Sequence, residues 1–134
     1  MAISALSCGL LPLNQGAMRF YNRMGYHDYE GIALDLDERG RIADSLGDNK
    51  AMILRNHGLL TVGTTIGQTF VRMHNLERAC ALQIQVMSTG QPIHLPPPEV
   101  CEKTAQQLNG TEFPADEWPA LIRWLDAQDT SYRN

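Results

Sequence analysis

The pattern of apolar and polar positions predicts an irregular first quarter, a pair of strands and then a set of helices. Residues 2–8 fit a short helix. Residues 9–31 are interrupted by glycine, proline and asparagine, which favours short strands or irregular packed segments over a helix. Residues 37–47 (DERGRIADSLG) predict a short helix, with Asp37 as its N-cap and Gly47 as its C-terminal stop.

Two apolar runs in the middle of the chain predict neighbouring strands at residues 51–56 (AMILRN) and 58–63 (GLLTVG). The polar stretch that contains His57 separates them. A side chain at a strand end is held by rigid backbone, which suits a metal ligand, and Gly58 lets another backbone or a ligand come close. From this setting alone His57 is either a structural histidine or a metal ligand, and one histidine cannot form a zinc site.

The clearest helix runs for about twenty-five residues from Thr65 to a stop at Gly90. Thr65 and Gln68 have the spacing of a capping box. Six apolar residues at helical intervals predict its buried stripe: Ile66, Phe70, Met73, Cys80, Ile84 and Met87.

Two further helices are predicted after the proline-stiffened stretch QPIHLPPPEV, residues 91–100, whose last residues overlap the first of these helices. One covers residues 98–110 and ends at Asn109-Gly110. The other covers residues 115–129, has Asp116 as its cap, and tolerates a proline in its first turn. Its predicted buried side consists of Trp118, Leu121, Ile122 and Leu125. Strands followed by helices predict an α/β or α+β domain in which helices cover a sheet.

Composition narrows the class of protein. With 134 residues, 43% hydrophobic and 19% charged, the chain is one globular domain. The net charge of −4 comes from interspersed charges without a basic patch, so nucleic-acid binding is not expected. No apolar run is long enough to cross a bilayer and no basic leader precedes the first residues, so we expect a cytoplasmic protein. Three cysteines, Cys8, Cys80 and Cys101, are expected to be reduced, buried thiols.

The other histidines show no metal-ligand spacing, because the chain contains no HxH, HExxH or CxxC. His27 has Asp28 and Glu30 beside it, a cluster that suits ligand binding but is more often a set of turn or surface residues. His74 is expected to be solvated or paired with a neighbour, and His94 to be structural.

The stretch LRNHGLLTVG strongly resembles the class II aldolase/adducin family. The preceding segment AISALSCGLLPLNQGAMRFYNRMGYHDYEGIALDLDE and the following TTIGQTFVRMHNLERACALQIQVMSTG resemble its adducin-like bacterial members. The resemblance implies a three-layer α/β/α domain with a mixed sheet, assembled as a homotetramer. It also implies a zinc ion near a subunit interface, with His57 as one ligand and an upstream HxH as others. Since that HxH would lie just before Ala2, residues 1–134 are expected to be a partial domain, incomplete on its N-terminal side.

For a complete member, the resemblance implies zinc-dependent aldol cleavage of a small sugar-derived carbonyl substrate, often phosphorylated. The family's catalytic tyrosine aligns near Asn14–Gly16, where this chain has no tyrosine. A non-catalytic adducin-like module for self-association or protein binding therefore stays open, as does a chain without a function of its own. Uncovered sheet edges and apolar helix faces lead us to expect a homo-oligomer in either case.

Overall fold

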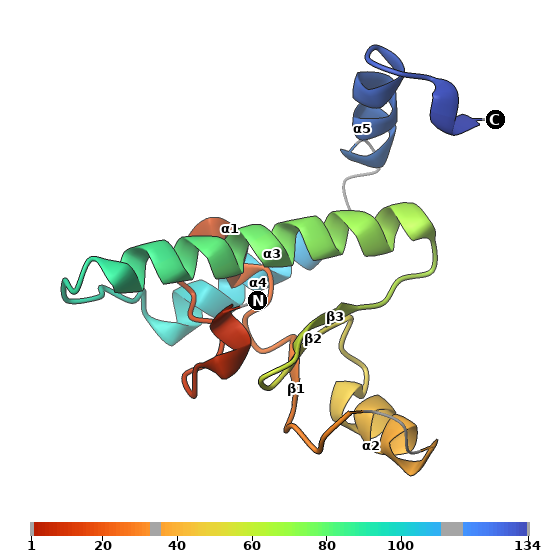
Figure 1. The fold of residues 1–134 in the computed structure, drawn as a ribbon. Coiled ribbons are helices and arrows are strands. Elements are labelled where there is room, and N and C mark those ends of the chain that lie inside the picture. The colour runs from red at the N-terminus through yellow and green to blue at the C-terminus, as the bar shows by residue number, and fades with distance from the viewer. Residues whose placement is uncertain (1, 33–35, 111–116, 134) are drawn as a thin grey trace.

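The computed structural model describes residues 2–32, 36–110 and 117–133. Within them the chain forms three short strands, a long central helix and shorter helices around it (Figure 1). In order, the elements are η1 (Ala2–Ala5), α1 (Gln15–Met18), β1 (Gly25–His27), α2 (Leu36–Leu46), β2 (Ala51–Leu54), β3 (Gly58–Thr61), α3 (Ile66–Ser88), α4 (Pro98–Gly110), α5 (Glu117–Asp126) and η2 (Ser131–Arg133). No helix in the described ranges is both long and apolar enough to cross a membrane.

The strands form a mixed sheet in the order β1-β2-β3, which confirms the predicted α/β class. β1 pairs with β2 in parallel, with His27 opposite Leu54. β2 and β3 are the predicted pair of strands, and they run antiparallel. α3 lies across one side of this sheet, and α2 packs against β1 on the other (Figure 1). The junction of β1 and α2 is therefore separated from α3 by the sheet.

The core lies between the sheet and α3, and the first element of the chain contributes to it. Its apolar side chains come from η1, the segment before β1, β2 and α3: Ile3, Phe20, Ala51, Ile53, Leu76 and Cys80. Burial raises the pKa of the Cys80 thiol to about 11. The expectation that all three cysteines are buried is wrong for Cys8, which is exposed, and right for Cys80 and Cys101.

The long helix forms where it was predicted, but the predicted stripe is partly on the wrong face. Ile66 is 82% exposed and Phe70 is 51% exposed. The Thr65 hydroxyl accepts the Gln68 N–H at 3.1 Å, as expected of a cap. The Gln68 side chain, however, accepts the hydroxyl of Thr64 instead of returning to Thr65. The buried face consists of Gly67, Val71, Leu76, Ala79, Cys80 and Gln83.

A buried polar side chain explains why the burial differs. Gln83 is fully buried on α3, and its amide nitrogen donates to the Gly9 carbonyl at 2.8 Å. Its oxygen accepts the Leu11 N–H at 2.7 Å. Since an unpaired buried amide would cost about 1–3 kcal/mol, these bonds hold the N-terminal segment against the face of α3 that carries Gln83.

Two predictions about the short helices before β2 need correction. α1 was not predicted, since residues 9–31 suggested strands or irregular segments. α2 begins at Leu36, so Asp37 lies in its first turn and is not its N-cap, whereas Gly47 (φ +52°) ends the helix as predicted.

The two C-terminal helices lie at the predicted positions. α4 is held to the segment before β1 by an ion pair of 2.7 Å between Arg23 and Glu102, and this hydrogen-bonded guanidinium lowers the Glu102 pKa to about 2. The expected buried side of α5 is only partly buried, and the Trp118 ring lies 5.4 Å from that of Phe70. The predicted cap Asp116 falls outside the described residues.

Candidate functional site

The polar interruption between β2 and β3 is a tight turn of three residues, 55–57. Asn56 adopts a left-handed backbone conformation, with φ of +56°. Asparagine is one of the few residues with a side chain that enters this region at low cost. The chain can therefore reverse at Asn56 and place Gly58 opposite Leu54 at the start of the antiparallel ladder.

Backbone hydrogen bonds join this turn to three other segments, β1, η1 and β2. The Arg55 N–H donates to the His27 carbonyl at 2.8 Å, which extends the contact with β1. The Asn56 N–H donates to the Ser4 carbonyl of η1 at 3.0 Å, and the His57 N–H donates to the Leu54 carbonyl at 3.1 Å. His57 is thus carried by a backbone whose position is set by β1, β2 and η1.

The Arg55 side chain fastens the same turn to the N-terminal segment. Its guanidinium donates to the carbonyls of Leu6 and Ser7, and it lies 4.8 Å from the centre of the Tyr26 ring. A cation over an aromatic face adds about 0.5–1 kcal/mol at a partly exposed position. Arg55 therefore connects the turn with β1 and with the segment that follows η1.

His57 itself is exposed, so its imidazole is open to a ligand from outside. Within the described residues, one group of histidine, cysteine or acidic side chains has three potential ligand atoms close together, and His57 is not in it. His74 lies exposed on α3 and His94 lies exposed in the connector before α4. The described residues alone therefore do not fit a zinc ion at His57, because such a site needs three protein ligands.

The group with three potential ligands consists of His27, Glu30 and Glu38 at the junction of β1 and α2, where the ligand atoms lie within 4.8 Å of one another. His27 is the last residue of β1 and is only 7% exposed. The expectation that it is a turn or surface residue is wrong. Strand residues alternate in direction, so Gly25 and His27 both face α2, which buries them, while Tyr26 is exposed.

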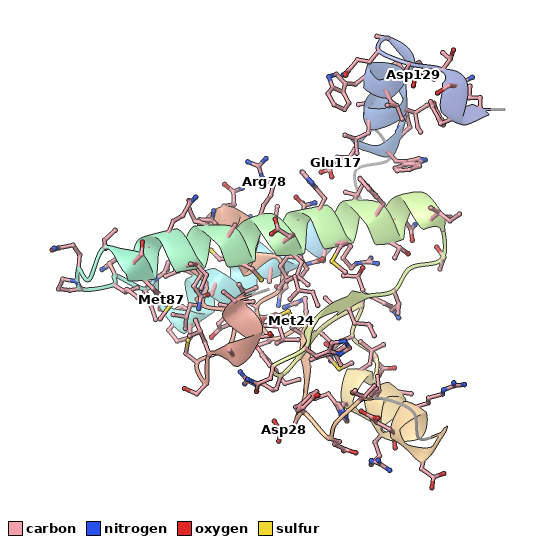
Figure 2. The ribbon with its side chains drawn as sticks, in the orientation of Figure 1. Met24, Asp28, Arg78, Met87, Glu117 and Asp129 are labelled. Atoms are coloured by element: carbon pink, nitrogen blue, oxygen red, sulfur yellow. The ribbon has the colours of Figure 1, made fainter. Side chains whose placement is uncertain are left out.

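A polar hollow of about 530 Å³ opens beside His27. Figure 2 shows Asp28, one of its lining residues, at the outer end of β1 on the side away from α3. The hollow is lined by residues of β1, the loop after it, α2 and the Arg55 turn: Tyr26, His27, Asp28, Glu30, Arg41, Asp44, Ser45 and Arg55. Arg55 is the structural link between this hollow and the turn that carries His57.

The sheet, the long helix and the turn around His57 define the class of protein. The chain belongs to the class II aldolase and adducin family, since the family model described as "Class II Aldolase and Adducin N-terminal domain" matches residues 1–84.

Solved structures support the same assignment. An aldolase II superfamily protein from Pseudomonas syringae shares 46% sequence identity with a TM-score of 0.92, over 99% of this chain and 55% of its own. L-fuculose 1-phosphate aldolase from Glaciozyma antarctica shares 30% identity with a TM-score of 0.72, over 94% of this chain and 48% of its own.

The curated relatives include proteins named as class 2 aldolases and proteins named as adducins. A Caulobacter vibrioides protein named for class 2 aldolases is 41% identical over 135 residues, which is 98% of this chain and 52% of the relative. Alpha-adducin of Rattus norvegicus is 43% identical over 96 residues, which is 70% of this chain and 13% of alpha-adducin. The chain therefore spans about half the length of the bacterial relative that it matches.

Proposed function

We propose that this chain contributes one ligand, His57, to the divalent-metal site of a class II aldolase-like enzyme. The observation that carries this proposal is the exposed imidazole on a turn that hydrogen bonds fix to β1, β2 and η1. A neutral imidazole held in this way can bind a metal ion without first ordering the backbone that carries it. Family membership supports the proposal, because the family is generally metal-dependent.

The remaining ligands are expected from outside the described residues. The Asn56 N–H bonds the Ser4 carbonyl, so the turn lies directly beside η1. At about 3.8 Å per residue, side chains just before Ala2 would come within reach of His57. The resemblance expects the HxH ligands there, which supports treating residues 1–134 as the C-terminal portion of the domain.

The proposed reaction is cleavage of a carbon–carbon bond in a small sugar-derived hydroxycarbonyl compound, often phosphorylated. The solved L-fuculose 1-phosphate aldolase supports this substrate class. A bound divalent ion, which we propose to be zinc, would polarise the substrate carbonyl. His57 would hold that ion with one neutral nitrogen, and the hydrogen bonds of the turn would orient the ring. We further propose a cytoplasmic homotetramer.

The test is a metal measurement on the protein expressed from its complete gene. Wild type, His57→Ala and His74→Ala are compared for bound zinc and for cleavage of L-fuculose 1-phosphate. Loss of zinc and cleavage in His57→Ala, with both kept in His74→Ala, is the expected result. Equal zinc in all three proteins would remove His57 from the metal site.

A second candidate function is a non-catalytic adducin-like module for self-association. The identity to alpha-adducin and the exposed apolar side chains at the start of α3 favour it. Under this hypothesis sedimentation shows a concentration-dependent oligomer that Phe70→Ser weakens and His57→Ala leaves unchanged. Oligomers without bound zinc and without cleavage would favour this module over the enzyme.

A further inference from the structure

We propose that His27, Glu30 and Glu38 form a second divalent-cation site, separate from His57, at the junction of β1 and α2. The proposal does not depend on the function proposed for His57. It rests on a buried imidazole nitrogen without a hydrogen-bond partner in the described part of the chain, on two carboxylates beside that imidazole, and on the charge of the hollow next to it.

The imidazole of His27 is fixed at one nitrogen and unsatisfied at the other. Its Nδ1 lies 2.9 Å from the Ser45 hydroxyl oxygen, within hydrogen-bond distance. Its Nε2 is buried and has no hydrogen-bond partner among the residues that the structure describes, and Glu30 Oε1 lies 3.8 Å from it. A buried polar atom left in this state costs about 1–3 kcal/mol. With Nδ1–H donating to Ser45, Nε2 presents a lone pair, which is the form that binds a metal ion.

The two carboxylates come from different segments, and each has an oxygen within 4.8 Å of a ring nitrogen of His27. Glu30 lies in the loop after β1, and Glu38 lies in the first turn of α2 and is only 7% exposed. Glu38 and Ser45 are seven residues apart, so they lie on one face of the helix with the imidazole between them.

The ligand atoms are close enough to share one ion. They lie within 4.8 Å of one another, whereas ligands of a tetrahedral ion with bonds near 2.1 Å are roughly 3.4 Å apart. Glutamate side chains can close this difference by rotation, so the backbone does not need to move.

The electrostatic balance favours a cation. Among the described residues, the hollow and the His27 group together hold four carboxylates and two guanidinium groups. An excess of acidic over basic side chains around a hollow attracts divalent cations. The four acidic residues are Asp28, Glu30, Glu38 and Asp44.

Arg41 is the competitor of the ion at this site. Its guanidinium donates to both oxygens of Glu30, at 3.1 Å from Nε to Oε1 and 2.5 Å from Nη2 to Oε2. Both side chains are solvent-exposed to about a third or more, so the ion pair is worth at most about 1 kcal/mol. A divalent ion held by three ligands can replace this ion pair.

The ligand set indicates the kind of ion. One imidazole nitrogen with two carboxylates suits first-row ions such as Zn²⁺ or Mn²⁺, whereas Mg²⁺ and Ca²⁺ prefer oxygen ligands throughout. Zn²⁺ and Mn²⁺ are therefore the probes, and Mg²⁺ is the matched negative control.

The experiment titrates each ion into the chain in competition with a chromophoric chelator, in a His57→Ala background that removes the other candidate ligand. Glu30→Gln, which keeps the size of an exposed side chain, is expected to weaken Zn²⁺ binding at least tenfold. Ser45→Ala is expected to weaken it by about 10–100-fold, because the ring loses its orienting hydrogen bond. His27→Ala is expected to abolish it.

The decisive variant is Arg41→Gln, since it changes affinity in the opposite direction. Removal of a competing ion pair worth 0.2–1 kcal/mol tightens binding by about 1.5- to 5-fold. A folding defect cannot imitate this gain. Unchanged or weaker binding in Arg41→Gln, or wild-type binding in His27→Ala, would overturn the proposal. Zinc binding that disappears in the His57→Ala background, before any pocket residue is changed, would also overturn it while supporting the function proposed for His57.

Discussion

The turn that carries His57 and the pocket around His27 adjoin each other, yet their construction is opposite. In the turn, backbone hydrogen bonds within a few residues and to η1 fix an exposed histidine. In the pocket, a buried histidine lies beside Ser45, eighteen residues away in sequence, and beside the carboxylates of Glu30 and Glu38. The two regions meet where the Arg55 N–H donates to the His27 carbonyl. A short sequence motif therefore identifies the turn that carries His57. The pocket around His27, in contrast, forms only when β1 and α2 pack together.

The largest expected change in stability follows from a substitution at Gly25, which lies where β1 packs on α2 beside the pocket. A Cβ at this position would lie 2.5 Å from the backbone carbonyl oxygen of Ser45, which cannot move without shifting α2. We expect Gly25→Ala to lower the free energy of unfolding by about 3 kcal/mol, as measured by urea denaturation.

Gly40→Ala is the matched control for this substitution. Gly40 lies in α2, and an added Cβ would meet nothing within 4 Å. We expect this change to stabilise the helix by about 0.5–1 kcal/mol. If both alanines destabilised the protein equally, the close packing of β1 on α2 would not be what forms the pocket.

The next largest change in stability is expected for substitutions of Asn56, the residue of the turn with a left-handed backbone conformation. Asn56→Val places a β-branched side chain at φ of +56°, which we expect to cost about 1–2 kcal/mol of unfolding free energy. Asn56→Gly keeps the conformation accessible and is expected to change stability by only a few tenths of a kcal/mol. Thermal unfolding of both variants gives the comparison, and a valine variant as stable as the glycine variant would contradict the turn geometry.

The difference between the regions also explains what the sequence can predict. The strand pair, Gly47 as a helix stop and Thr65 as a cap depend on neighbouring residues, and the structure confirms them. The burial of His27 depends on the close approach of Gly25 to α2, which no local pattern contains. In Gly25–His27 the aromatic residue is exposed and the glycine and histidine are buried, so hydrophobicity gave no signal of this strand.

The misplaced stripe of α3 has a similar origin. Hydrophobicity ranked Ile66 and Phe70 above the small or polar residues of the same helix, yet Gly67 and Gln83 are the buried ones. A Cβ on Gly67 would lie 2.6 Å from the Trp118 ring, and Gln83 is buried because it bonds the N-terminal segment. Both causes are contacts between distant segments, so a helical pattern could not contain them.

A smaller loss of stability is expected for the substitution of Arg55, which belongs to the turn and also lines the pocket. Arg55→Ala removes the guanidinium bonds to the carbonyls of Leu6 and Ser7 and the contact with the Tyr26 ring. We expect a loss of about 1 kcal/mol, because both carbonyls lie where water can replace the donor. Hydrogen exchange should quicken at the Asn56 amide, which bonds η1, and remain unchanged in the β2–β3 ladder. Equal loss of protection in both places would mean that Arg55 supports the sheet and not the attachment of η1.

The smallest change in stability is expected for the substitution of His57, although His57 belongs to the most specific sequence motif of the chain. His57 is exposed and its backbone bonds do not involve the ring, so His57→Ala should change the free energy of unfolding by no more than about 0.5 kcal/mol. His27→Ala should cost more, because it leaves the Ser45 hydroxyl unpaired and opens a cavity beside β1. Urea denaturation of the two variants in parallel tests the contrast between the regions. A large loss for His57→Ala would show that its ring stabilises the fold, and would leave the motif with a structural explanation in place of a ligand-binding one.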